Sequence, residues 1–104
     1  MALLAIFTGQ GYMKDMYETL RRESDFEHKP PPGLMFHVVS FEKSGNTMHA
    51  VEIWESEEQL NNMISTRLMP LVQKHKMPLM KMETYQVHNI NAFPEIDKHR
   101  IIPM

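Results

Sequence analysis

The sequence predicts an α+β protein with the element order β-α-β-β-α-β. Two segments carry apolar residues at the three- and four-residue spacing of amphipathic helices. Four shorter segments are rich in the β-branched and aromatic residues that favour strands. At 104 residues the chain is long enough for one domain. We expect that domain to span residues 1–91 and a C-terminal tail to span residues 92–104.

The first two elements are a strand and a helix. Residues 2–8 form a short apolar run that ends at Gly9 and Gly11, which favours a strand. In the next segment one helical face is apolar, and it consists of Met13, Met16, Tyr17 and Leu20. Residues 25–33 contain three consecutive prolines, so we expect an extended connection there.

A β-hairpin follows this connection. Two strands, at residues 34–43 and 47–54, flank a turn at residues 44–46. If that turn is a three-residue loop, Phe41 opposes His49, and His37 lies on the same face as His49. This register segregates apolar from polar side chains better than its alternative, and it is therefore favoured.

The register decides which polar side chains meet. In the three-residue register His37 opposes Ile53, and both Glu52 and Trp54 lie on the other face. A two-residue turn made of Gly45 and Asn46 alone would instead oppose His37 to Trp54, with Glu52 on that same face. Which groups line a common site therefore depends on the length of this turn.

A strand running directly into a helix at residues 49–70 is the most distinctive feature of the sequence. Ser56 and Gln59 have the spacing of a capping box, in which each residue satisfies a backbone N–H of the other. Pro70 lacks the N–H that would continue the helix, and we expect a kink or break near residues 67–69. A last strand is expected at residues 80–90.

This order is that of the ferredoxin-like fold, an antiparallel sheet with two helices on one face. Such a sheet normally has one polar face, but these strands carry apolar side chains on both faces. Two helices cover only one face, so the other would expose an apolar patch. A second copy packed sheet to sheet is the simplest cover, and it predicts a homodimer. In the first strand one face carries Ala2, Leu4 and Ile6, and the other carries Leu3, Ala5 and Phe7. In the second strand one face carries Met35, Val39 and Phe41, and the other carries Leu34, Phe36 and Val38.

Composition argues against several classes of partner. The net charge is −2 with both signs interspersed, so we expect neither nucleic acid nor a membrane surface as a partner. The chain has no cysteine, which removes disulfides and thiolate metal ligands. The apolar start is too short to span a bilayer and lacks the flanks of a signal peptide, so we expect a cytoplasmic protein.

The sequence resembles the dimeric α+β barrel superfamily, and within it the antibiotic-biosynthesis-monooxygenase-like (ABM-like) group. The resemblance covers nearly the whole domain through the segments FHVVSF, VEIWESEEQL, RLMPLVQK and TYQVHN. The Trp-Glu-Ser step from strand to helix is its most specific element. The resemblance implies a homodimeric barrel, and it identifies fold far better than function.

Two branches of this group can be compared residue by residue. Haem-degrading members carry a Trp early in the second helix, an Asn in the first strand and a His further along the helix. Here Met63 follows Asn62, the first strand lacks Asn, and only His75 lies near the expected His. Quinone-forming members hold an aromatic substrate between sheet and helices without flavin or metal, and of their residues only Trp54 is carried over.

Candidate site residues lie in the predicted strands. His37, His49 and His88 need hydrogen-bond partners if they lie among apolar neighbours, and with Trp54 they are the candidates to line a pocket. Glu52 is the candidate general base, because burial favours the neutral form of a carboxyl group. The competing interpretation of Glu52 is a hydrogen bond or salt bridge at the dimer face. Eleven methionines offer soft ligands, but no carboxylate–histidine cluster has metal-ligand spacing, so no metal site is expected.

Three functions follow from these features. The first is a monooxygenase that needs no cofactor and acts on a small aromatic or other apolar molecule. The second is a non-catalytic homodimer, either ligand-binding or stress-associated, with a soft methionine-rich cavity. The third is a haem binder.

Overall fold

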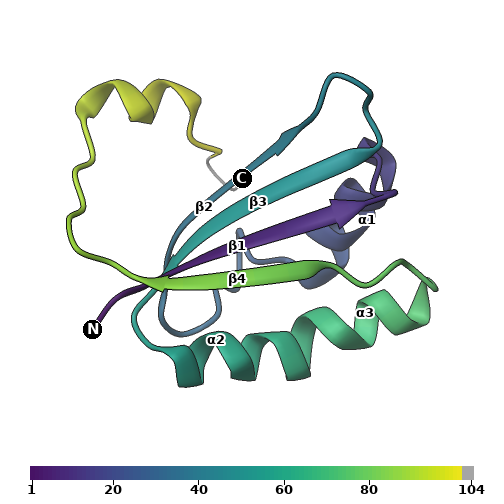
Figure 1. The fold of residues 1–104 in the computed structure, drawn as a ribbon, viewed down its shortest axis with the longest axis horizontal. Coiled ribbons are helices and arrows are strands. Elements are labelled where there is room, and N and C mark those ends of the chain that lie inside the picture. The colour runs from purple at the N-terminus through teal and green to yellow at the C-terminus, as the bar shows by residue number, and fades with distance from the viewer. Residues whose placement is uncertain (102–104) are drawn as a thin grey trace.

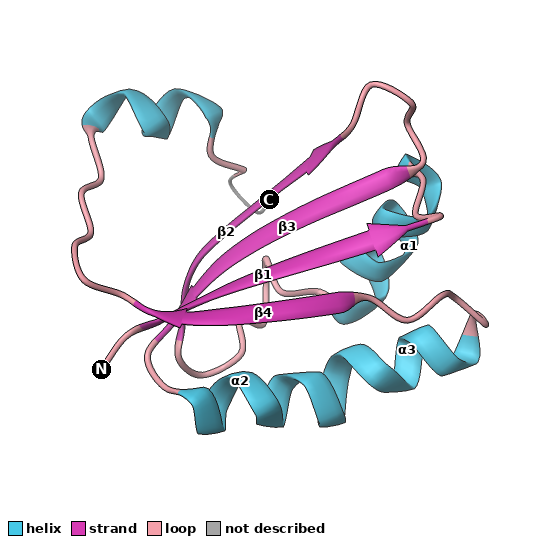
Figure 2. Cartoon of the chain, in the orientation of Figure 1, coloured by secondary structure: helices cyan, strands magenta, loops and turns pink. Residues whose placement is uncertain are grey.

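The computed structural model describes residues 1–101 and has the predicted α+β architecture (Figure 1). Four strands form one antiparallel sheet in the order β2-β3-β1-β4. The helices α1, α2 and α3 lie on one side of this sheet (Figure 2). The strands are β1 (Leu3–Gln10), β2 (Leu34–Phe41), β3 (Thr47–Trp54) and β4 (Lys81–Gln86). The helical elements are α1 (Lys14–Ser24), α2 (Glu57–Met63), the π-helical turn η1 (Ile64–Leu68), α3 (Met69–Lys74) and the 3₁₀ helix η2 (Pro94–His99).

The β2–β3 hairpin has neither of the two registers expected from the sequence. His37 pairs with Glu52, and Phe41 pairs with Met48. The loop contains four residues, 43–46, and is closed by a hydrogen bond from the Glu42 N–H to the Thr47 carbonyl. The prediction of a three-residue loop was wrong by one residue. A shift of one residue in the pairing moves the side chains of one strand to the opposite face of the sheet relative to the other strand.

A β-bulge at the start of β2 adds a second correction. Leu34 pairs with Trp54 and Phe36 pairs with Ile53, so Met35 is the extra residue. Leu34 therefore packs against the core, although the alternation of the sequence had placed it on the same face as Phe36. Met35 is exposed.

The strand-to-helix junction and the Ser56 N-cap are confirmed, but the reciprocal half of the capping box differs, because the Gln59 side chain accepts from the Ser56 hydroxyl instead of the Ser56 backbone N–H. The Gln59 N–H donates to Ser56 Oγ at 3.2 Å, and Ser56 Oγ–H donates to Gln59 Oε1 at 2.9 Å. Near Pro70, where a kink or break was expected, the helix continues through the π-helical turn η1, in which the Met69 N–H bonds to the Ile64 carbonyl five residues earlier. Because Pro70 has no N–H, the wider turn lets the helix continue without the missing bond.

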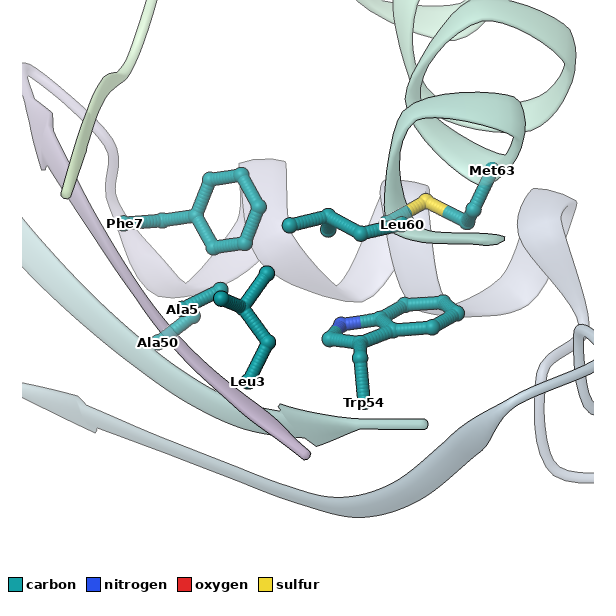
Figure 3. Close-up of a cluster of buried hydrophobic side chains, with 7 residues drawn as sticks. All are labelled: Leu3, Ala5, Phe7, Ala50, Trp54, Leu60 and Met63. Carbon is teal, nitrogen blue, oxygen red and sulfur yellow. The ribbon is translucent and has the colours of Figure 1, made fainter. Parts of the chain in front are cut away.

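The main core lies between the sheet and α2 (Figure 3). Trp54 and Leu60 have no exposed surface, and the Trp54 ring lies beside the side chains that α2 directs toward the sheet. Burial of each large apolar side chain stabilises the fold by about 1.5–3 kcal/mol. The seven buried members are Leu3, Ala5, Phe7, Ala50, Trp54, Leu60 and Met63.

The helices α1, α2 and α3 leave the other face of the sheet uncovered. The alternate residues of β1 and β3 on this face are half-buried, whereas their neighbours on the helix side are buried. Strand β4 ends at Gln86, four residues before the expected end. Residues 87–101 then leave the sheet on the side away from α2 and α3 and include η2 (Figure 1). The apolar residues of the outer face are Leu4, Ile6, Phe36, Val38, Val51 and Ile53.

The predicted tail, 92–104, lies only partly within the described residues, since 102–104 fall outside them. Its 3₁₀ helix, Pro94–His99, had no counterpart among the sequence-based expectations. A search of residues 1–101 finds no helix with the length and apolar character needed to cross a membrane.

Candidate functional site

A cavity of about 920 Å³ begins between the sheet and the helices and continues around the edge strand β2, where Phe36 and Val38 of the outer face also line it. Its inner wall is mostly apolar, and it extends past α1 and the edge strand β2 to residues of the C-terminal segment. Volumes of about 300–1,000 Å³ are usual for small-molecule sites. The apolar wall consists mainly of Phe7, Leu20, Val39, Phe41, Met48, Ala50, Met63, Leu68, Leu71 and Met80.

Four side chains form a continuous hydrogen-bonded chain at this cavity. The Tyr17 hydroxyl lies 3.1 Å from His37 Nε2, and His37 Nδ1 lies 2.7 Å from Glu52 Oε2. The other carboxylate oxygen, Oε1, accepts the indole N–H of Trp54 at 2.9 Å. Tyr17, His37 and Glu52 line the cavity, whereas Trp54 lies beneath it in the core.

Strand geometry brings three of these residues together. Glu52 and Trp54 are two residues apart on β3, so their side chains point to the same face. His37 faces Glu52 across the β2–β3 ladder, and directly opposed side chains in antiparallel strands lie close together. Glu52 is 3% exposed, and both of its oxygens have partners. A buried carboxylate needs such partners to avoid a large desolvation cost.

Helix α1 contributes Tyr17. Its ring is roughly parallel to the His37 ring, with the centroids 6.3 Å apart, and meets the Phe41 ring at 71°. Burial raises the pKa of the Tyr17 hydroxyl, and the Arg21 guanidinium opposes part of that shift. Tyr17 therefore keeps its proton at neutral pH and donates it toward His37 Nε2.

The remaining sequence candidates lie elsewhere. His49 is on the outer face of the sheet, where its Nε2 lies 2.7 Å from Glu42 Oε2. His88 is exposed after β4 and lines a small surface pocket with Leu4 and Ile53. Neither of these histidines lines the large cavity.

His75, the residue nearest to the histidine of haem-degrading proteins, contacts Glu23 instead of the cavity. Its Nε2 lies 2.8 Å from Glu23 Oε2. Together with Lys74, this contact lowers the pKa of the Glu23 carboxyl. Within residues 1–101, no three His, Asp, Glu or Cys side chains come together as metal ligands.

Sequence reasoning grouped His37, Glu52 and Trp54 only in the alternative register. The alternative register correctly placed the three side chains on one face of the sheet. It was wrong about the residue opposite His37, which is Glu52 and not Trp54. Tyr17 was placed on the apolar face of its helix and was not recognised as part of a site. The signal for it was a phenol on that face, because a buried tyrosine hydroxyl needs a polar partner from another element.

The comparisons with known proteins identify the fold. No protein-family model and no curated protein matches the sequence. Among solved structures, a variant of SnoaB, a cofactor-independent oxygenase from Streptomyces nogalater, superimposes with a TM-score of 0.66 at 12% identity, covering 86% of this chain and 95% of SnoaB.

Two further structures extend this result. An antibiotic biosynthesis monooxygenase has a TM-score of 0.65 at 14% identity and covers 84% of this chain and 99% of its own. Rv0793 from Mycobacterium tuberculosis has a TM-score of 0.62 at 13% identity, with coverages of 88% and 100%. The structural neighbours thus include antibiotic-biosynthesis-monooxygenase proteins, and the chain shares their ferredoxin-like fold, as the sequence resemblance implied.

Proposed function

We propose that this protein is a cofactor-independent monooxygenase that acts on a small aromatic or other apolar molecule. The observation that carries the proposal is the apolar cavity of about 920 Å³ with a Tyr17–His37–Glu52 chain on its wall. The fold shared with SnoaB, itself described as a cofactor-independent oxygenase, supports the same activity. Fold alone does not determine function, so the site has to supply the chemistry.

The reaction needs a base, a dry cavity and molecular oxygen. In an anthrone-type substrate a ring CH₂ group loses one proton to a base, and the resulting carbanion takes up O₂. Loss of water from the peroxide then leaves a carbonyl group. One oxygen atom enters the product and the other leaves as water, with both hydrogens of the CH₂ group. O₂ is the oxidant, and the protein supplies binding, orientation and proton transfer.

We also propose that the active form is a homodimer packed through the outer faces of its sheets. Six apolar side chains lie on that face, and Val38 is 45% exposed. The segment after β4 adds Ile90, Phe93 and Ile101, each about half or more exposed. In this proposal residues 1–91 form the domain and residues 92–104 the tail, of which the described part, residues 92–101, adds apolar surface to the contact.

A second function is favoured by the methionines in the cavity. Met48, Met63 and Met80 line it, and flexible thioether side chains adapt to ligands of different shapes. A non-catalytic ligand-binding dimer would use the same cavity without changing its ligand. It predicts saturable binding of apolar molecules by thermal shift and recovery of the ligand unaltered.

Oxygen consumption separates the two functions. The protein would be incubated with a panel of anthrones and quinols while dissolved O₂ and product absorbance are recorded together. For the anthrones the monooxygenase predicts one O₂ consumed per CH₂ group converted to a carbonyl, with a rate that saturates in substrate. A His75→Gln variant serves as control and should keep the rate, because His75 contacts Glu23 and lies outside both the large cavity and the outer face of the sheet. Saturable binding of the same compounds without O₂ uptake would reject the monooxygenase and support the ligand-binding function.

A further inference from the structure

His37 has one ring nitrogen held by the protein core and the other directed toward α1. Nδ1 contacts Glu52 Oε2, whereas Nε2 contacts only the Tyr17 hydroxyl among the described residues. The His37 side chain is 31% exposed, and that of Glu52 is 5% exposed. A molecule in the cavity therefore reaches His37 far more easily than it reaches Glu52.

Glu52 determines which nitrogen of His37 carries the proton. The carboxylate accepts the Trp54 N–H at one oxygen, and its other oxygen faces His37 Nδ1. A carboxylate only accepts hydrogen bonds, so Nδ1 is the protonated nitrogen of the neutral imidazole. Nε2 then has a free lone pair, which accepts a hydrogen bond from the Tyr17 hydroxyl in the absence of a ligand.

We propose that His37 Nε2 accepts the proton of a weakly acidic hydroxyl group, a phenol or an enol, on the apolar molecule bound in the cavity. Glu52 is the positioning residue that fixes the ring and stabilises the imidazolium. This inference rests on the proposed function of the cavity, and it moves the role of base from Glu52 to His37. The carboxylate, with both oxygens bonded, is left to hold the ring.

The proton transfer is balanced without an oxidant. The ligand O–H bond breaks, its proton forms the second N–H bond of the imidazole, and the electron pair stays on the ligand as a phenolate or enolate. The new imidazolium lies between that anion and the Glu52 carboxylate. Tyr17, freed from Nε2, keeps its proton because burial raises its pKa, and its hydroxyl can donate to the ligand oxygen.

Other charged groups around the cavity are mostly paired with one another. On the α1 side Arg21 contacts Glu18 at 3.0 Å and Glu27 at 2.5 Å, and Lys14 also lines the cavity. From the C-terminal segment, Arg100 lies 3.3 Å from Asp97, and His99 lines the same cavity. Glu52 is therefore the charged group in direct contact with His37, and its effect on the imidazolium should dominate.

The test uses 4-nitrophenol, because its phenolate absorbs at a longer wavelength than the neutral phenol. The full chain would be titrated with this probe under nitrogen at a series of pH values, and the pKa of the bound probe read from its spectrum. We expect bound 4-nitrophenol to ionise at least one pH unit below the free probe, a tenfold change in its equilibrium. His75→Gln, a control outside the cavity, should give the same shift.

Three variants assign the shift to residues. His37→Gln should abolish it, and Glu52→Gln should reduce it, since the imidazolium would lose its carboxylate. Tyr17→Phe should retain most of it. If Glu52→Gln does not fold, the variants at the partly exposed His37 and Tyr17 decide the question.

The outcomes separate this inference from the proposed function. Binding of neutral 4-nitrophenol, absence of binding, or an unchanged shift in His37→Gln would overturn the assignment of His37. A full shift together with absence of O₂ uptake would contradict the monooxygenase and leave the assignment in place.

Discussion

His37 Nδ1 and Glu52 Oε2 lie 2.7 Å apart, although the two residues are 15 positions apart in the chain. They meet because a four-residue loop sets the β2–β3 register and because both side chains point toward the helices. With a loop one residue shorter, the imidazole and the carboxylate would lie on opposite faces of the sheet. The site therefore depends on the length of a surface turn that contains no site residue.

Trp54→Phe tests the buried end of the hydrogen-bonded chain. The variant removes the indole N–H and leaves Glu52 Oε1 buried without its partner, at a cost of about 1–3 kcal/mol plus the loss of packing. Urea unfolding should show this decrease. A double-mutant cycle with Glu52→Leu, which removes the acceptor, separates the two contributions, and a coupling near zero would mean that the hydrogen bond adds nothing to stability.

Gly33→Ala tests the contact between the start of β2 and the capping box. Gly33 has φ +90°, and an added Cβ would lie 2.3 Å from Gln59 Oε1. We expect a loss of about 2 kcal/mol or more, because backbone strain of about 1–2 kcal/mol adds to the clash. The matched control is Gly45→Ala, at φ +78° with nothing within 4 Å, which should show the backbone strain alone. Equal losses at the two positions would mean that the clash is absent.

Val51→Lys tests the proposed dimer. Val51 lies at the centre of the outer face, between Ile6 and Val38, so a lysine there should place a charge in the contact. Sedimentation should show the dimer dissociation constant increased by about tenfold or more, equivalent to about 1.4 kcal/mol, with the fold retained. Asn61→Lys on the exposed side of α2 adds the same charge and should leave the dimer intact. A monomeric unmodified protein at micromolar concentration would contradict the proposal.

Alkaline pH should destabilise the protein through Tyr12. Burial raises the pKa of its hydroxyl, which donates to the Pro78 carbonyl, so the folded state keeps this proton to a higher pH than the unfolded state. The resulting stability is complete below about pH 10, the ordinary tyrosine value, and is lost as the pH rises toward the folded-state pKa. Urea unfolding at increasing pH should show this decrease, and Tyr12→Phe should weaken it. Equal pH dependence in the two proteins would exclude Tyr12 as its source.

The element order was predictable because it depends on local patterns. The Ser56–Gln59 capping box and the period of the following helix identify α2, and Pro70 identifies the disturbance that becomes a π-helical turn. The β3 strand, Thr47–Trp54, was predicted to the residue because turn residues precede it and the capping box follows it.

The site was harder to predict because it depends on register. Loops of three or four residues are both compatible with the Ser-Gly-Asn turn. The loop length decides whether His37 lies on the same face of the sheet as Glu52 or on the opposite face. The bulge at Met35 and the partner of Tyr17 are equally absent from local patterns. Both are fixed by packing between elements that lie far apart in the sequence.

The most direct test of the site is the tautomer of His37. Nitrogen-15 NMR of histidine-labelled protein at about pH 8.5, where imidazole is ordinarily neutral, would assign His37 by its loss in His37→Gln. We expect a protonated Nδ1 and an unprotonated Nε2, with that preference lost in Glu52→Gln. A protonated Nε2 in the unmodified protein would contradict it, because the nitrogen facing the cavity would then be unable to accept a proton.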